Sequence, residues 1–184
     1  MGGHHLILGE LEDYLTGEML ADTHDERYRQ KIARFLVEQK GYPQADIEPR
    51  RPLVVAAGDR KGQLTVDFTI AVDGRMAMVI KYAPGSLVTR HRPTLAISRL
   101  IAPHRVPVVV VTNGESADIL DGTSGALTAT GLDGIPSRES LVRQLDGMVF
   151  EPVPENRREM EARIVYAFEI EGSCPCDDST CRIA

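Results

Sequence analysis

Residues 64–82 read LTVDFTIAVDGRMAMVIKY, with an apolar run on each side of the Asp-Gly pair at 73–74. An Asp-Gly pair between two such runs is a strong signal for a β-hairpin, because both residues tolerate the positive φ angles of a tight turn. The first run alternates, so Asp67 is expected to point away from the face that carries the aromatic side chain next to it. The second run is apolar almost throughout and ends at Lys81, which is typical of a strand covered on both faces. We expect this hairpin to lie at the centre of the fold.

The rest of the chain predicts further strands and helices around this hairpin. The most apolar run, residues 106–111, must be a central strand, and a crossover helix would let it pair in parallel with the second hairpin strand. Other strands are expected at 53–57, 117–120 and 126–130, and helices at 6–15, from a cap at Thr23 or Asp25 to Gly41, at 94–101, from Ser137 to about 145, and at 155–168. This order predicts a mixed α+β fold with a central mixed sheet flanked by helices.

The composition is that of a globular protein, 42% hydrophobic and 26% charged, and 184 residues fit one ordinary domain. We expect a helical extension at 1–22, a main domain at 23–150, and a helix with a cysteine-containing tail at 151–184. No apolar run approaches the roughly 18 residues of a membrane span, and the start lacks the basic region of a secretory signal. Three cysteines confined to the last eleven residues do not suggest a disulfide framework. Cytoplasm is therefore the expected location.

Charge is unevenly distributed along the chain. The net charge is −6, yet residues 74–114 contain no Asp or Glu and carry +6, which leaves −12 for the remainder. Such segregation can present a local positive face to phosphates, with Arg90, Arg92 and Arg99 as candidate nucleic-acid contacts. The alternative is that these arginines pair with the acidic segments on either side.

Several short pieces of sequence, taken together and in order, resemble a known family. They are Glu26-Arg27 opening a helix, Gly41-Tyr42 after it, Glu48 before a strand, Asp67 and Lys81 on the hairpin, and Thr112-Asn113-Gly114 after the apolar strand. Over about residues 26–114 the chain resembles the N-terminal domain of the type I restriction enzyme R subunit, a member of the PD-(D/E)XK nuclease superfamily.

The resemblance implies a nuclease-like fold and a metal-dependent site for phosphodiester hydrolysis. In that site Asp67 and a Glu two residues before the lysine would hold Mg²⁺, Lys81 would orient the attacking water, and Glu26 would contribute from the helix. Hard carboxylate oxygens suit Mg²⁺, which lowers the pKa of bound water, and a lysine stabilises the developing charge. DNA is the partner that the resemblance implies.

The sequence departs from the family pattern at the second metal ligand. The position two residues before Lys81 is Val79, which cannot bind a metal, so the pattern here is D-x11-V-x-K. An acid from elsewhere would have to fill the vacancy, with Glu38, Glu48 and Asp59 as candidates. The family's glutamine-and-tyrosine motif on the next helix is also missing, and no G-x-x-x-x-G-K-[ST] motif for an ATP-driven translocase occurs. We therefore expect a nuclease-like module without a translocase domain.

The cysteine tail is the other stretch that could carry chemistry. Cys174, Cys176 and Cys181 form a C-x-C-x4-C pattern that could bind Zn²⁺ or an iron–sulfur cluster. Both usually need four ligands, so a histidine such as His4, His5 or His24 would have to complete the set. Nucleases of this superfamily that hold a cluster also use an upstream cysteine, which is absent here. Free thiols are the alternative.

Two functions of different classes remain open. One is a Mg²⁺-dependent endodeoxyribonuclease acting at Asp67 and Lys81, impaired or inactivated by Val79. The other is a non-catalytic module of the same fold that binds nucleic acid or a protein partner, and a weaker third is a metal or redox sensor using the cysteine tail. Simpler explanations exist for single residues, since Asp67 could be a solvent-facing strand residue and Glu26 could complement the helix dipole. The sequence leaves a homo-oligomer open.

Overall fold

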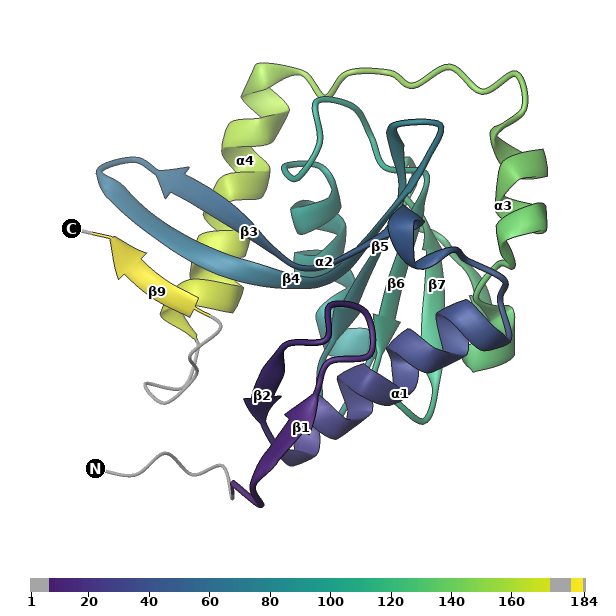
Figure 1. The fold of residues 1–184 in the computed structure, drawn as a ribbon. Helices are drawn as coiled ribbons and strands as arrows, with labels where there is room; N and C mark the ends of the chain where they lie inside the picture. The colour runs from purple at the N-terminus through teal and green to yellow at the C-terminus, as the bar shows by residue number, and fades with distance from the viewer. Residues whose placement is uncertain (1–6, 173–179, 184) are drawn as a thin grey trace.

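One mixed sheet organises the molecule, whose computed structural model describes residues 7–172 and 180–183 (Figure 1). Within these residues the sheet has seven strands in the order β3-β4-β5-β6-β7-β8, with β9 also paired to β4. Strands β5 and β6 run parallel, and the other neighbours are antiparallel. The strands are β3 (Ile47–Ala57), β4 (Arg60–Val72), β5 (Arg75–Tyr82), β6 (Val108–Thr112), β7 (Ala117–Asp121), β8 (Leu127–Thr130) and β9 (Thr180–Ile183).

Helices cover both faces of the sheet. Helices α1 (His24–Glu38) and α3 (Arg138–Leu145) pack in one apolar cluster, to which they contribute Ile32, Leu36 and Leu141. Helices α2 (Val88–Ser98) and α4 (Glu155–Val165) pack in a second cluster on the other side of β5. Short helical turns are η1 (Gln44–Asp46), η2 (Leu132–Gly134) and η3 (Tyr166–Glu171), the last of which continues α4. The predicted mixed α+β class, with a nuclease-like mixed sheet between helices, is confirmed.

The central hairpin forms as the sequence predicts. Asp73 and Gly74 have φ angles of 50° and 74°, the left-handed values that its two-residue turn requires. Met78 and Ile80 lie in the α1 cluster while Val79 lies in the α2–α4 cluster, so β5 is covered on both faces. The parallel pairing of β5 with β6 is also confirmed.

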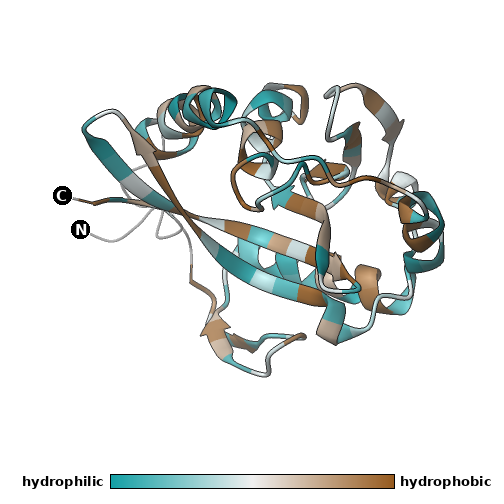
Figure 2. Cartoon of the chain, turned by 90° about the horizontal axis from the view of Figure 1, so that it is seen from above, coloured by the Kyte–Doolittle hydropathy of each residue, from teal (hydrophilic) through white to brown (hydrophobic). Residues whose placement is uncertain are grey.

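The β3–β4 hairpin extends well beyond the rest of the sheet (Figures 1 and 2). Strand β4 pairs with β5 only over its last residues, from Phe68 onward, and its first part pairs with β9 instead. Val66 and Phe68 point to the same side of β4, yet Val66 lies in the α2–α4 cluster and Phe68 in the cluster with α1. The reason is that the long hairpin twists as it leaves the sheet. Asp67 lies at this change of neighbours. In Figure 2 the far tip of the hairpin is hydrophilic.

The prediction of a helix at residues 6–15 is wrong. The described part of this segment forms β1 (Glu10–Glu12), which pairs with β2 (Met19–Ala21) in a two-stranded sheet. The leucine spacing suggested a helix, but Asp13 accepts hydrogen bonds from the backbone N–H groups of Leu15 and Thr16 and so stabilises a turn. Gly17, at φ 74°, completes the reversal.

Helix α2 begins earlier than predicted. It starts at Val88 and ends at Ser98, so Pro93 lies within the helix and not at its boundary. The Pro93 side chain is buried, and its packing offsets the one helical hydrogen bond that a proline cannot donate.

No helix in the described part of the chain has the length and apolar character that crossing a membrane requires.

Met160, Ile164 and Phe168 recur every four residues and indicate one buried face for the helix at 155–168, but of the three only Ile164 packs against the apolar cluster. Met160 and Phe168 are 52% and 57% exposed, whereas Ala162 and Val165 are buried against the sheet. Glu161, a charged residue, is fully buried on that inner face. Its ion pairs with arginines, described below, allow this orientation.

Candidate functional site

Asp67 and Lys81 meet at the point where β4 and β5 separate. The regular pairing of the two strands ends at Phe68 and Ile80, and Lys81 Nζ lies 3.2 Å from Asp67 Oδ2. The same carboxylate oxygen accepts a hydrogen bond of 2.8 Å from the backbone N–H of Tyr82. Both side chains are at least 90% buried. The corner that the sequence indicated is therefore present.

The other oxygen of the Asp67 carboxylate is bound by an arginine from α1. Arg29 Nε donates to Asp67 Oδ1 over 2.6 Å, and the same guanidinium group lies 3.6 Å from Glu26 Oε2. Sequence reasoning identified Glu26 and missed Arg29, although the i, i+3 spacing of the two on α1 was a usable signal. The Asp67 carboxylate thus has a cationic partner on each oxygen.

Further charges extend this cluster towards the N-terminal hairpin. Arg50 lies 3.6 Å from Glu26 and 2.8 Å from the buried Asp13, and Gln30 donates to both of these acids over 2.8 Å. Arg50 has a φ of 51° and sits on β3 between the residues that pair with those flanking Asp67. Acids and bases therefore alternate from Asp13 through to Lys81. We call the six charged residues Asp13, Arg50, Glu26, Arg29, Asp67 and Lys81 the charge ladder.

The charges of the ladder stabilise its ionised forms. Burial alone would raise the pKa of Asp67, but Lys81 and Arg29 outweigh it and hold the pKa below its usual value. Burial would lower the pKa of Arg29, yet Asp67 and Glu26 raise it. For Asp13, burial is outweighed by hydrogen bonds from Gln30 and Arg50, and its pKa falls to about 2. The ladder contains three acidic and three basic residues, so its formal charges balance.

The residues at this corner do not fit a Mg²⁺ site. Both oxygens of Asp67 are already bound, and Val79 is fully buried in the apolar α2–α4 cluster. The acids that might have replaced the missing ligand lie elsewhere: Glu38 contacts Tyr14, Glu48 pairs with Arg51, and Asp59 is exposed in the β3–β4 turn. Within the described residues no three His, Cys, Asp or Glu side chains are grouped as a metal site.

The arginines predicted to contact nucleic acid face acids of the C-terminal helical segment. Arg92 Nη1 and Arg99 Nη1 each lie 2.6 Å from a different oxygen of Glu161, and Arg157 adds a third guanidinium at 2.8 Å. Arg90 pairs with Glu169 at 3.4 Å. The side chain of Arg99 is 91% buried, so at this position the ion-pair interpretation has the geometric support. Burial raises the pKa of Glu161, but the arginines reverse that effect and lower it.

The cysteine tail is described only in part. Cys174 and Cys176 lie outside the described residues. Cys181 is exposed on β9, opposite Gln63 of β4. Binding of Zn²⁺ or an iron–sulfur cluster by the three cysteines therefore stays a prediction.

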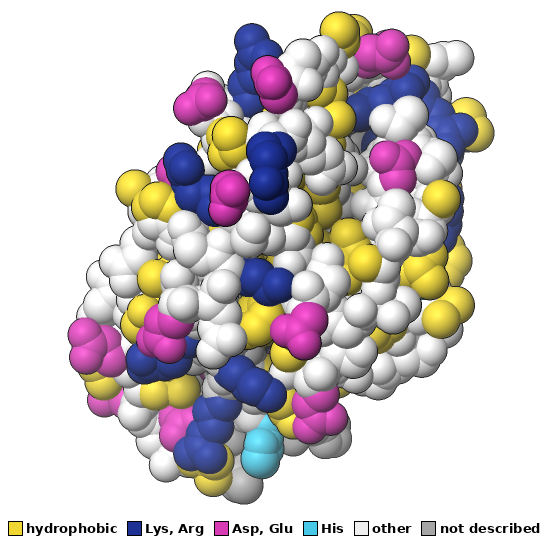
Figure 3. Space-filling view, turned by 90° about the vertical axis from the view of Figure 1, so that its right-hand side faces the viewer, with side chains coloured by type: hydrophobic (Ala, Val, Ile, Leu, Met, Phe, Trp, Pro, Cys, Tyr) yellow, Lys and Arg dark blue, Asp and Glu magenta, His cyan; other side chains and the backbone are white. Residues whose placement is uncertain are grey.

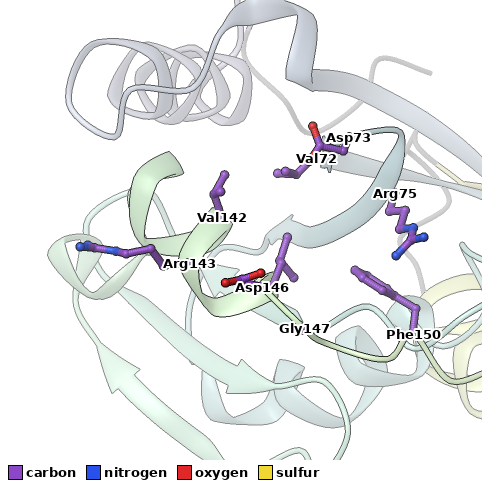
Figure 4. A pocket seen from close by; sticks show the side chains of 9 residues that line it. Val72, Asp73, Arg75, Val142, Arg143, Asp146, Gly147 and Phe150 are labelled. Atoms are coloured by element: carbon purple, nitrogen blue, oxygen red, sulfur yellow. The ribbon is translucent and has the colours of Figure 1, made fainter.

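A cavity of about 500 Å³ lies at the other end of the central hairpin (Figure 4). It opens between the β4–β5 turn and the end of α3, where Val72 faces Val142 and the Arg75 guanidinium lies over the Phe150 ring. Arg143 extends away from the cavity in this view. None of the candidate residues from the sequence lines it, so it forms no part of the Asp67–Lys81 corner.

Comparison with known proteins identifies the family of this chain. A family model described as type I restriction enzyme R protein N terminus matches residues 24–136, which include α1, α2 and strands β3 to β8. No curated protein and no solved structure gives a significant match. Because the matched segment is more than half of the chain, this protein belongs to the family of type I restriction enzyme R protein N-terminal domains.

Proposed function

We propose that this protein is a non-cleaving, nuclease-like module in which the Asp67–Lys81 corner has become a structural ion-pair cluster. The observation that supports this most directly is the position of Arg29, whose guanidinium donates to Asp67 Oδ1 and so competes with any cation for that oxygen. Val79 removes the second carboxylate of the family pattern. With both changes, each Asp67 oxygen already accepts a hydrogen bond, and the corner lacks the excess negative charge that attracts a divalent cation.

Family membership supports DNA as the partner of such a module. The net charge of −6 argues against a broadly basic contact surface, and the face in Figure 3 shows acidic and basic side chains intermixed. Binding would therefore depend on a small local site and would be strongly weakened by salt. A cytoplasmic location is part of the same proposal.

A divalent-cation titration combined with a cleavage assay tests the loss of activity. The full chain is titrated with Mg²⁺ and with Mn²⁺ in a calorimeter, and the same preparation is incubated with supercoiled plasmid DNA and either ion. We expect no saturable heat of binding and no nicking or linearisation. Asp67→Asn serves as the control, because it removes the carboxylate charge at nearly unchanged size and should behave as the wild type in both assays.

The alternative function, an impaired but active endodeoxyribonuclease, gives a different result. It requires Mg²⁺-dependent nicking by the wild type that disappears in both Asp67→Asn and Lys81→Met. Nicking that persists in both variants would instead indicate a contaminating nuclease. Observation of the Asp67-dependent activity would overturn the proposal, because a corner closed by Arg29 could not supply it.

A further inference from the structure

A small basic pocket lies beside the start of α4 and near the N-terminal end of β6, whereas Lys81 lies beside the other end of β6, opposite Val111. It has a volume of about 280 Å³ and is lined by Arg99, Arg105, Thr123, Val153, Pro154 and Arg157. All three charged lining residues are arginines. The volume is slightly below the range of roughly 300–1,000 Å³ typical of small-molecule sites, which favours a compact ligand.

Positive charge exceeds negative charge around this pocket. Glu161 is a single carboxylate shared by three guanidinium groups, those of Arg92, Arg99 and Arg157. Arg105 has its own partner in Glu151, at 3.2 Å, but that acid is 64% exposed, so solvent and salt weaken the pair. The pocket therefore retains cationic character after its internal pairs are counted.

Donor groups in the pocket remain available to a ligand. Arg157 binds Glu161 through Nε, and no described residue accepts from either of its Nη atoms. Arg105 uses Nη1 for Glu151, and its Nε and Nη2 atoms are likewise without an acceptor among the described residues. Arg99 is fixed in place by Glu161 and by the carbonyl oxygen of Thr123, at 2.6 and 3.0 Å. A rigid arginine thus stands beside two that can donate in pairs.

The start of α4 adds backbone donors to the same pocket. Helix α4 is eleven residues long and is preceded by Pro154, which has no side chain able to cap it. The first N–H groups of a helix have no acceptor within the helix and carry the positive end of its dipole. Arg157 and Arg158 donate their backbone N–H groups to the carbonyl oxygen of Pro154, which leaves those of Glu155 and Asn156 without an acceptor among the described residues; these two residues directly follow Val153 and Pro154, which line the pocket.

From these observations we propose that the pocket binds a phosphoryl group, carried by a small molecule or by the end of a nucleic-acid strand. Arg105 and Arg157 bind its oxygens through charge-assisted hydrogen bonds, and the first turn of α4 binds a further oxygen. The site is distinct from the charge ladder and does not depend on the loss of cleavage at Asp67. It would give an acidic protein a local contact for phosphate.

Calorimetry on the full chain with inorganic phosphate tests the site, with sodium chloride of equal ionic strength as the reference. We expect saturable binding that weakens about tenfold in Arg157→Gln and about tenfold in Arg105→Gln, since each loses a charge-assisted bond. Arg51→Gln is the matched control, because Arg51 is also partly exposed and paired to one acid, but on β3. It should bind phosphate as the wild type does.

Two DNA duplexes of identical sequence, with and without 5′-terminal phosphates, identify the source of the group. Preference for the phosphorylated duplex, abolished by excess inorganic phosphate and by Arg157→Gln, assigns the pocket to strand ends. Binding of free phosphate without such a preference assigns it to small phosphorylated molecules. Arg105 does not contact Glu161, so Arg105→Gln decides the result if Arg157→Gln proves unstable. Absence of saturable phosphate binding, or equal affinity in Arg105→Gln and the wild type, would refute the site.

Discussion

Arg29 of α1 donates to Asp67 of β4 through a hydrogen bond of 2.6 Å that joins the first long helix to the central hairpin. The bond lies within a ladder of alternating charges that also reaches the N-terminal hairpin through Arg50 and Asp13. A buried ion pair stabilises a protein only if both partners are present, because a lone buried charge is costly. Variants of the ladder therefore separate a structural role from a catalytic one.

Replacement of Asp67 by alanine should destabilise the fold strongly. The change leaves Arg29 and Lys81 without their shared carboxylate, and removal of one partner of a buried pair typically costs about 3–5 kcal/mol. Urea unfolding followed by circular dichroism measures the loss. Asp59→Ala, in the exposed β3–β4 turn, is the control and should stay within about 0.5 kcal/mol of the wild type. An Asp67→Ala variant as stable as the wild type would show that the ladder does not hold the fold together.

Stability should fall in acid because of the same carboxylates. The pKa of Asp13 is lowered from 3.8 to about 2 in the folded protein, so its contribution is fully present above about pH 4. As the pH falls towards 2, Asp13 is protonated more readily in the unfolded chain than in the folded protein, so the contribution of its ionised carboxylate to stability is lost. Asp67 acts in the same direction, because its folded-state pKa is also lowered. Midpoints of urea unfolding between pH 7 and pH 2.5 should therefore decrease most steeply below pH 4.

The variant Asp13→Asn isolates one part of this pH dependence. It removes the titrating group, so the variant should be less stable at pH 7 and should lose less stability than the wild type on acidification. Parallel pH profiles for the two proteins would contradict the assignment of the lowered pKa to Asp13.

Glu161 should be essential for the packing of α4 on α2. It is fully buried and pairs with Arg99 of the α2 C-terminus and with Arg92. Glu161→Ala leaves these guanidinium groups unpaired and should cost about 3–5 kcal/mol. Glu159→Ala, two residues away on the exposed face of α4, should change the free energy of unfolding by less than about 0.5 kcal/mol. Similar effects of the two substitutions would contradict the buried network.

Local sequence patterns predicted the centre of the fold and failed at its margins. The Asp73-Gly74 turn, the parallel β5–β6 pair and the Ser137 cap of α3 follow from short-range chemistry, and all three are present. The 6–15 segment failed because leucines at helical spacing outweighed the turn-forming contacts of Asp13 in our interpretation. Those contacts are local, but the burial of Asp13 depends on Arg50, 37 residues away.

The candidate site was predicted in position but not in character. Asp67 and Lys81 could be identified because the hairpin register brings them together. Arg29 could not be assigned to Asp67 from the sequence, because that contact depends on how α1 packs on the sheet. Arg90, Arg92 and Arg99 raised the same difficulty. Their acidic partners lie on the C-terminal helical segment, and apolar spacing had oriented that segment wrongly.

Val79 provides the sharpest test of the proposal that the Asp67–Lys81 corner does not bind a metal. Val79→Glu restores the family pattern but places a carboxylate in the apolar cluster around Ile97 and Val165, which should cost about 3 kcal/mol or more. Val79→Gln, of similar size and without charge, should cost less. Mg²⁺ should raise the melting temperature of Val79→Glu only when Arg29→Ala is also present, since Arg29 otherwise occupies Asp67. If Mg²⁺ stabilised the single variant just as well, Arg29 would be shown to yield to a cation, and the corner would be a metal site lacking one ligand.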